Sequence, residues 1–349
     1  MVVGGGLIGL AAATALAERN VTVTLIGQHK LGEASPAAAG MLAPSVEKAA
    51  GPAHDFAVAA RDRYPDYVAF LEDRTGIKVP LNRLGILQVA LSQKGIKGLK
   101  KPAVATARWL DQKELRDIEP SLSHAVGAMY NPDDGAVDNM VLVSALEKYV
   151  SASERITTVV DVATEIAARE SSATVKTRSR GSHAARRLVL AAGAWAPQIP
   201  GARLAKAVQP ARGQLISYSI APLRHVAYGP RGYLVPRAGS TIGGSTMEYV
   251  GYDASTTDDG VKRVRSAAEE ICPPLSSVNT TRAWAGLRPV TPDMLPIIGP
   301  DPEQPSCIYA CGHSRNGVLM APLTGDLIAD LVTGTPLSFD LSQFRPDRF

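Results

Sequence analysis

The sequence lacks long apolar runs and is poor in cysteine. No run in its 349 residues approaches the roughly 20 apolar residues that a membrane-spanning helix needs. The chain opens directly into a glycine-rich segment, so we expect no signal peptide. Its three cysteines, Cys272, Cys307 and Cys311, are too few and too badly spaced for a disulfide framework or a zinc site. These absences predict a cytoplasmic globular protein without a metal.

A strong charge of one sign is also missing, since the formal net charge is only +4. Two groups supply much of the positive charge: Lys94, Lys97, Lys100 and Lys101, and then Arg178, Arg180, Arg186 and Arg187. No aromatic residues interleave with them, which favours solvated loops and hairpin edges over a nucleic-acid or membrane surface. Electrostatic steering of an anionic substrate stays open.

The N-terminus carries a glycine pattern that is typical of dinucleotide-binding proteins. A short strand over Met1–Val3 leads into Gly4, Gly6 and Gly9, and a helix over residues 10–18 follows. The first glycine permits the turn, the second lets the backbone approach a pyrophosphate, and the third lets helix and strand pack closely. The pyrophosphate would lie at the positive end of the helix. A merely tight turn is the alternative.

The acidic residue that usually follows the second strand of this pattern is absent. After the strand over residues 21–26, Gly27 occupies its place. Such an acid holds the ribose hydroxyls of NAD, so its absence disfavours a nicotinamide cofactor. Gln28 or His29 could substitute.

The remaining pattern predicts an α/β protein with a Rossmann-like domain and an inserted antiparallel-sheet domain. Residues 56–74 and 141–150 are helical in period, with Pro65 able to split the first helix. The expected strands cover residues 85–91, 159–166 paired with 174–177, 188–192, several antiparallel segments between 214 and 247, and 307–310 before a loop and a last helix that ends near Gly334. We assign residues 1–80, 137–204 and 284–349 to the cofactor domain, and residues 81–136 and 205–283 to the substrate domain.

Several longer motifs resemble one enzyme family. They are SPAAAGMLAP (35–44), LVLAAGAWAP (188–197), WAGLRP (284–289), PIIGP (296–300), and GHSRNG followed by LMAP (312–322). Together they resemble the D-amino-acid oxidase family of FAD enzymes, in particular its glycine oxidases, over nearly the whole chain. The sarcosine oxidases of that family attach flavin through a cysteine near the TPD segment. RPVTPD (288–293) has none here, which indicates non-covalent FAD.

The resemblance implies two sets of site residues. Besides the glycine loop, the FAD contacts would come from Leu7, Ile8, Gly27, Gln28, Ala34, Ser35, Ala39, Gly40, Met41, Val159, His313, Ser314, Arg315, Asn316, Gly317, Val318 and Leu319. The substrate contacts would come from Arg288, Arg315, Tyr233 and Met247. Arginine grips a carboxylate with two parallel hydrogen bonds, as an amino-acid substrate requires.

Each of these substrate residues also has a plain structural interpretation. Arg288 could be a surface ion-pair partner, and Arg315 could brace its loop. Met247 fits a core position, and Tyr233 could be an ordinary strand aromatic. We interpret His313 as a residue that structures its loop, because hydride transfer from a neutral amine leaves little for a general base to do.

The implied activity is oxidation of glycine, sarcosine or D-alanine to the imine and then the 2-oxo acid. A hydride passes to flavin N5 and oxygen is reduced to hydrogen peroxide, so no catalytic acid or base is assigned. The implied partners are the amino acid, molecular oxygen, a thiazole synthase of thiamine biosynthesis, and further copies of the chain.

Three other functions remain open from the sequence. A D-amino-acid dehydrogenase would use another electron acceptor. An RNA-modifying flavoprotein would leave the arginine and tyrosine residues without purpose. A nicotinamide dehydrogenase is disfavoured by Gly27 and by GHSRNG.

Overall fold

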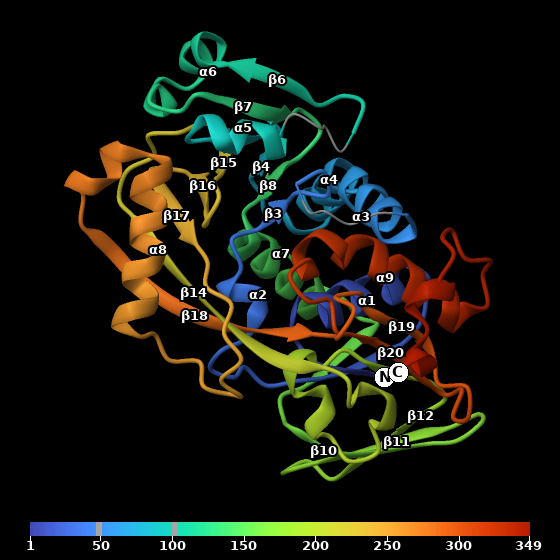
Figure 1. Cartoon of the computed structure of the whole chain (residues 1–349). Coiled ribbons are helices and arrows are strands. Elements are labelled where there is room, and N and C mark those ends of the chain that lie inside the picture. Colours follow the sequence, from blue (N-terminus) through green and yellow to red (C-terminus); the bar gives the residue numbers. More distant parts are fainter. Residues whose placement is uncertain (47–50, 100–103) are drawn as a thin grey trace.

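Residues 1–46, 51–99 and 104–349 are described here from a computed structural model of the chain (Figure 1). Lys100 and Lys101 of the first basic group lie outside these residues. Among the described helices, none combines the length and the apolar character that crossing a bilayer requires.

A mainly parallel sheet carries the N-terminus at its centre. Its strands run in the order β19-β20-β13-β1-β2-β9. Their bounds are β1 Val2–Val3, β2 Val23–Ile26, β9 Ile156–Val159, β13 Leu188–Leu190, β19 Ile297–Pro300 and β20 Cys307–Cys311. All neighbours pair in parallel except β19, which is antiparallel at the edge. The apolar strands are buried on both faces, as expected of a parallel sheet.

Helices from both ends of the chain pack around this sheet. They include α1 Leu7–Glu18, α2 Ala34–Ala37, α3 Pro52–Asp62, α4 Tyr64–Thr75, α7 Asn139–Ala152 and α9 Gly317–Thr333. Gly325 lets α9 approach α1 closely, because a Cβ there would lie 2.8 Å from the Ala11 carbonyl oxygen. The predicted helix over residues 56–74 is two helices that meet at Arg63, with Pro65 in the first turn of α4, where its missing N–H costs little.

The strand predicted over residues 159–166 is wrong as a single element. Val159 ends β9 of the parallel sheet, and the chain then enters a separate antiparallel sheet of β10 Ala163–Ala168, β11 Ala173–Thr177 and β12 Ser182–Ala185. Asp161 makes the break, since its carboxylate accepts hydrogen bonds from the backbone N–H groups of Val162, Ser179 and Arg180 at 2.7–2.8 Å. The predicted pairing with residues 174–177 holds for β10.

The predicted antiparallel sheet is present, and the described residues give it eight strands in the order β18-β14-β17-β16-β15-β5-β7-β6. Their bounds are β5 Ile86–Ala90, β6 Arg108–Asp111, β7 Gly127–Asn131, β14 Gln209–Tyr218, β15 Val226–Tyr228, β16 Tyr233–Arg237, β17 Ser240–Gly244 and β18 Thr280–Val290. Only the β15–β5 pair is parallel. Helices α5 Gln93–Leu99, α6 Gln112–Ile118 and α8 Asp258–Ile271 accompany the sheet, and α8 packs on β14, β16 and β17.

The two large sheets are joined through a small antiparallel sheet and a long strand. The small sheet consists of β3 Met41–Leu42, β8 Gly135–Val137 and β4 Leu81–Asn82. Strand β18 pairs with β14 along its whole length and also contacts α2 beside the cofactor-side helices (Figure 1). The α/β fold class with an added antiparallel sheet is therefore confirmed, and the junction between the sheets is where a site can form.

Candidate active site

A cavity of about 570 Å³ runs from the glycine loop to the antiparallel sheet. Its wall contains most of the residues expected to contact cofactor or substrate: Gly4, Gly6, Leu7, Ile8, Gly27, Gln28, Ala34, Ser35, Ala39, Gly40, Met41, Tyr233, Arg288, His313, Ser314, Arg315, Asn316, Gly317 and Val318. Cavities of this size accommodate small-molecule ligands. Within the described part of the chain, no group of three or more His, Cys, Asp or Glu side chains could hold a metal ion.

The glycine loop has the close packing that its sequence predicts. Gly4 has φ +121°, and a Cβ there would lie 2.2 Å from the carbonyl oxygen of Ala191. Gly9 lies outside the cavity wall, and a Cβ there would lie 1.9 Å from the Gly4 carbonyl oxygen. Gly9 therefore serves helix packing, as expected of the third glycine. Gly6 is the N-cap of α1, and the Leu7 N–H donates to Ser35 Oγ at 2.9 Å.

Gly27 packs directly on this loop. A Cβ at Gly27 would lie 2.7 Å from the Gly5 nitrogen, so the loop occupies the space in which an acidic side chain would start. Gln28 lines the cavity beside it. His29 does not; it contacts Glu33 at 3.2 Å and is 79% exposed. Of the two residues considered as substitutes for the missing acid, Gln28 is the one that lines the cavity.

Two cations also line this end of the cavity, and the sequence analysis assigned neither to the site. Lys30 lies 5.2 Å from the ring centroid of Trp195, and Arg178 comes from the turn after β11. Burial, followed by the positive charge of Arg178, lowers the pKa of Lys30. Arg178 is exposed, as expected of a solvated loop, yet it also faces the cavity. The pattern of charges along the sequence does not show which cations face the cavity.

The C-terminal loop closes the opposite wall. Gly312 at φ +70° and Ser314 at φ +49° turn the chain, and the Ser314 N–H donates to the Pro289 carbonyl at 2.9 Å. Helix α9 then begins at Gly317, with Asn316 as its N-cap, so its positive end faces the cavity. Leu319 points into the core instead and lies outside the wall.

His313 is a buried neutral residue of this loop. Desolvation by burial lowers its pKa to about 3, and its Nε2 lies 3.1 Å from Thr324 Oγ1 of α9. A ring held in this way connects the loop to the helix and is poorly suited to accept protons from substrate. The geometry supports the prediction that His313 structures the loop.

Arg288 lies flat across a neighbouring strand. It projects from β18, and a Cβ at Gly213 of β14 would lie 2.0 Å from Arg288 Nη1. The guanidinium therefore occupies the space of the side chain that Gly213 lacks. Its Nη1 donates to the Thr246 carbonyl at 3.1 Å and its Nη2 to Ser245 Oγ at 2.7 Å. A planar fork held along these bonds is pre-organised to meet a carboxylate.

Tyr233 of β16 also packs over a glycine of a neighbouring strand, β17. It is paired with Gly244, where a Cβ would lie 2.5 Å from the tyrosine hydroxyl. The ring is 8% exposed and stacks on Tyr228 with centroids 6.2 Å apart. Arg315 is exposed and donates to the Tyr228 hydroxyl at 3.2 Å. Arg315 thus braces its loop against the sheet and lines the cavity as well.

Besides Gly9 and Leu319, two more expected site residues lie outside the cavity wall. Met247 is 40% exposed and outside the cavity wall, so it is neither a core residue nor a lining residue. Val159 pairs with β2 in the parallel sheet and does not reach the cavity, whereas Val162 does. Val159 was expected in the site from the family resemblance, and the turn at Asp161 separates its strand from the residue that lines the cavity.

The cavity fits an FAD molecule in its chemical character. Glycines without room for a Cβ form one wall, and the N-termini of α1 and α9 both face the interior. An extended cofactor with a central pyrophosphate and a flavin ring that becomes anionic on reduction suits two positive helix ends. Cys311 is in the wall, but burial raises the pKa of its thiol to about 12 and keeps it protonated.

Comparison with known proteins identifies the family of the chain. The family model described as FAD dependent oxidoreductase (DAO) matches residues 1–331. The glycine oxidase of Geobacillus kaustophilus is 33% identical over 372 residues, covering 99% of this chain and 96% of that protein. The bifunctional protein ThiO/ThiG of Synechocystis sp. is 37% identical, but the chain spans only 54% of its length.

Solved structures give the same result. The crystal structure of the Geobacillus kaustophilus glycine oxidase superposes with a TM-score of 0.89 at 32% identity, covering 100% of this chain and 98% of that one. The glycine oxidase structure from Bacillus cereus gives 0.87 at 26% identity, with 96% of each chain covered. The expected family and cofactor are thereby confirmed: the chain is an enzyme of the FAD-dependent oxidoreductase family to which the glycine oxidases belong.

Proposed function

We propose that this enzyme oxidises the C–N bond of glycine or a similarly small amino acid, such as sarcosine or D-alanine. The observation that carries the proposal is the position of Arg288 and Tyr233. Both line the same cavity as the glycine loop and the N-terminus of α9. A carboxylate-binding fork and the cofactor cradle thus share one enclosed space.

The side chains of the site have different roles. The Arg288 fork binds the substrate carboxylate, and the Tyr233 hydroxyl is placed on the neighbouring strands to add a donor. FAD, when bound, supplies the two-electron acceptor for the α-hydrogen. With the amine neutral, no side chain has to remove a proton from carbon, which makes orientation the main demand on the site. The neutral, buried His313 is consistent with this.

We also propose the details that accompany this reaction. FAD is held without a covalent bond, oxygen is reduced to hydrogen peroxide, and the imine either hydrolyses to the 2-oxo acid and ammonia or passes to a consuming enzyme. The bifunctional ThiO/ThiG relatives support a thiazole synthase as the consumer of the imine, in thiamine biosynthesis. The residue roles, the boundaries of the two domains, a homo-oligomeric state and a cytoplasmic location remain predictions.

A peroxide-release assay across glycine, sarcosine and the D- and L-amino acids tests the proposal. We expect small amines to exceed bulky ones and D-isomers to exceed L-isomers. Reduction of a dye or quinone by the same substrates without peroxide would indicate a D-amino-acid dehydrogenase instead. A clear preference for L-amino acids would contradict the proposed substrate class. Acid precipitation tests the cofactor link, because non-covalent flavin stays in the supernatant.

A further inference from the structure

The segment that holds Arg288 lies on the far side of the strand that Arg288 crosses. Strand β14 has β18 on one edge; on its other edge it has β17 and then residues 245–248. Arg288 starts on β18, passes over Gly213 and ends on Ser245 and Thr246. Its position therefore depends on how firmly residues 245–248 are attached to β14.

This attachment is made by backbone and side-chain bonds together. The backbone N–H of Arg212 donates to the Glu248 carbonyl at 2.8 Å, and that of Glu248 donates to the Arg212 carbonyl at 2.9 Å. Thr246 Oγ1 accepts the Gln214 N–H at 3.0 Å and donates to Glu248 Oε2 at 3.2 Å. The carboxylate of Glu248 thus fixes the residue whose carbonyl receives Arg288.

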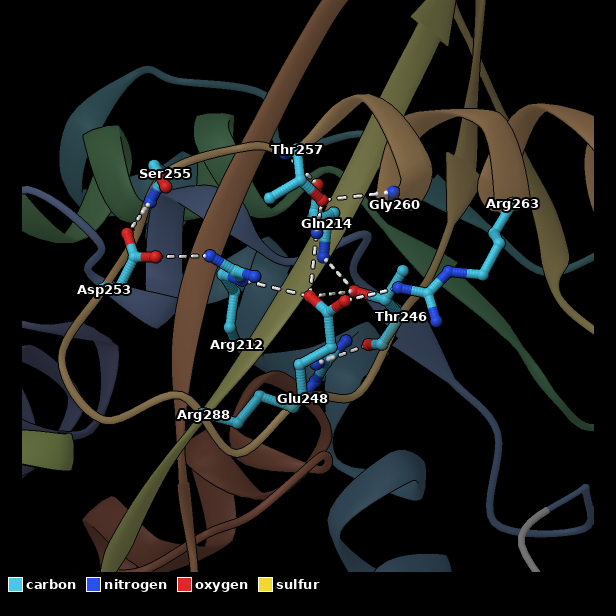
Figure 2. Close-up of polar contacts among 10 residues, drawn as sticks. All are labelled: Arg212, Gln214, Thr246, Glu248, Asp253, Ser255, Thr257, Gly260, Arg263 and Arg288. Carbon is cyan, nitrogen blue, oxygen red and sulfur yellow. Dashed lines mark hydrogen bonds and ion pairs between the residues drawn. The ribbon is translucent and has the colours of Figure 1, made fainter.

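Glu248 is the centre of the polar network in Figure 2. Its carboxylate accepts hydrogen bonds from Arg212 Nε at 3.0 Å, from Gln214 Nε2 at 2.8 Å and from Arg263. Arg212 is 5% exposed and Gln214 is fully buried. Burial raises the pKa of Glu248, but the bonds from Gln214 and Arg212 outweigh it and leave the pKa lowered. Glu248 is therefore an anion at neutral pH.

The network lies outside the cavity. Side chains alternate along a strand, so Arg212 and Gln214 point to the face of β14 opposite Gly213. Arg212, Gln214, Thr246 and Glu248 are all absent from the cavity wall. Removing the charge of this multiply bonded carboxylate, whose side chain is 16% exposed, loosens what it holds, because its donors lose their partner.

On the basis of the proposed function, we infer that Glu248 is a positioning residue for substrate binding. It fastens residues 245–248 to β14 and so sets the guanidinium of Arg288 at the angle that a substrate carboxylate meets. It touches neither substrate nor cofactor. Loss of its charge weakens carboxylate binding while the cofactor site and the oxidation of bound substrate are retained.

The test is Glu248→Gln in the FAD-loaded enzyme. We expect the KM for glycine to rise about 5- to 30-fold with kcat changed less than about 3-fold, the range that the loss of one or two positioning hydrogen bonds gives. The dissociation constant of acetate, followed by its perturbation of the flavin spectrum, should rise by the same factor. Glu248→Asp should recover part of the loss.

Two further variants keep the result decisive. Gly213→Ala displaces Arg288 without touching the network and should reproduce the increase in KM and in the acetate constant. Glu119→Gln is the matched control, since Glu119 is a buried carboxylate of the same sheet region, bonded to His225 and the Arg224 N–H and outside the cavity wall. It should lower stability but leave both constants unchanged.

The inference is overturned if Glu248→Gln lowers the melting temperature as Glu119→Gln does while the KM and the acetate constant stay at wild-type values. A wild-type flavin spectrum that does not respond to acetate would overturn it too. A wild-type enzyme that binds acetate but does not oxidise glycine contradicts the proposed function alone, and the acetate constants of the variants then decide the role of Glu248.

Discussion

The glycine loop and the residues that hold Arg288, here called the Arg288 seat, both bring polar groups close together. They differ in how far apart their residues lie in the sequence. In the loop, Gly4 and Gly9 are five residues apart and pack on each other. In the seat, Gly213, residues 245–248 and Arg288 come from three separate segments. Both places use a missing Cβ to bring polar groups close together. The contact between Gly4 and Gly9 follows from neighbouring residues, whereas the seat exists only after the antiparallel sheet has formed.

This difference predicts different consequences of mutation. Damage to the loop should remove the cofactor, because the loop is the cradle itself. Damage to the seat should leave a protein that retains its flavin but binds its substrate poorly. The variants below separate these outcomes, beginning with the largest effect.

Gly9→Ala should have the largest effect. Its Cβ would lie 1.9 Å from the Gly4 carbonyl oxygen, so helix α1 must move away from the loop. We expect a cost on the order of 3 kcal/mol or more and a protein that retains little flavin. The absorbance ratio of flavin to protein after purification measures this. Gly98→Ala is the control, because Gly98 of α5 lies outside the cavity wall and a Cβ there would meet no atom within 4 Å; equal flavin retention in the two variants would contradict the account.

Arg288→Ala should reduce catalytic efficiency on glycine by about 30-fold or more. Deleting one partner of a charge-assisted pair in a partly dry site costs on the order of 2–5 kcal/mol. Arg288→Lys should rescue only part of the loss, because a point charge cannot reproduce the planar fork. FAD content should stay normal. A variant that loses flavin while its residual holoenzyme keeps wild-type kinetics would show that Arg288 is structural.

His313 should make the stability of the cofactor side of the protein depend on pH. Its folded-state pKa of about 3 lies below the usual value of 6.5, so the unfolded chain binds more protons between these values. Stability is therefore present above pH 6.5 and is lost as the pH falls, by about 1 kcal/mol between pH 6.5 and 5.5. In His313→Gln that increment should vanish from the unfolding free energy. An unchanged acid sensitivity would mean that His313 is not the buried neutral group described here.

Trp284→Phe should have the smallest effect and tests how the two regions are joined. Trp284 Nε1 of β18 donates to the Ala37 carbonyl at 3.0 Å, which ties the antiparallel sheet to α2. Losing this bond should cost about 1 kcal/mol of stability. FAD affinity and the KM for glycine should each change less than about 3-fold. A loss of either function as large as that of Arg288→Ala would mean that the two regions are not separable.

The structural features that were predicted correctly from the sequence are those that depend on residues close together in the chain. The glycine loop, the split at Pro65 and the last helix follow from motifs whose members lie close together in the chain. Most of the expected cavity-wall residues came from the family resemblance. Sequence prediction failed for the strand expected over residues 159–166, which a turn interrupts where Asp161 binds Ser179 and Arg180, 18 and 19 positions away. It also missed Lys30, Arg178 and Ser245, which reach the cavity only through tertiary structure. Met247, expected in the pocket from the family resemblance, follows the end of β17 and lies outside the cavity wall.

The most direct test of the central claim is the flavin absorbance of the holoenzyme mixed with glycine in the absence of oxygen. If a small amino acid bound at Arg288 delivers its hydrogen to the cofactor, the oxidised-flavin band should disappear in the wild-type enzyme. At a low glycine concentration, Arg288→Ala should lose the band about 30-fold more slowly. A flavin band that glycine, sarcosine and D-alanine leave unchanged, but that an L-amino acid or a reduced nicotinamide bleaches, would contradict the account.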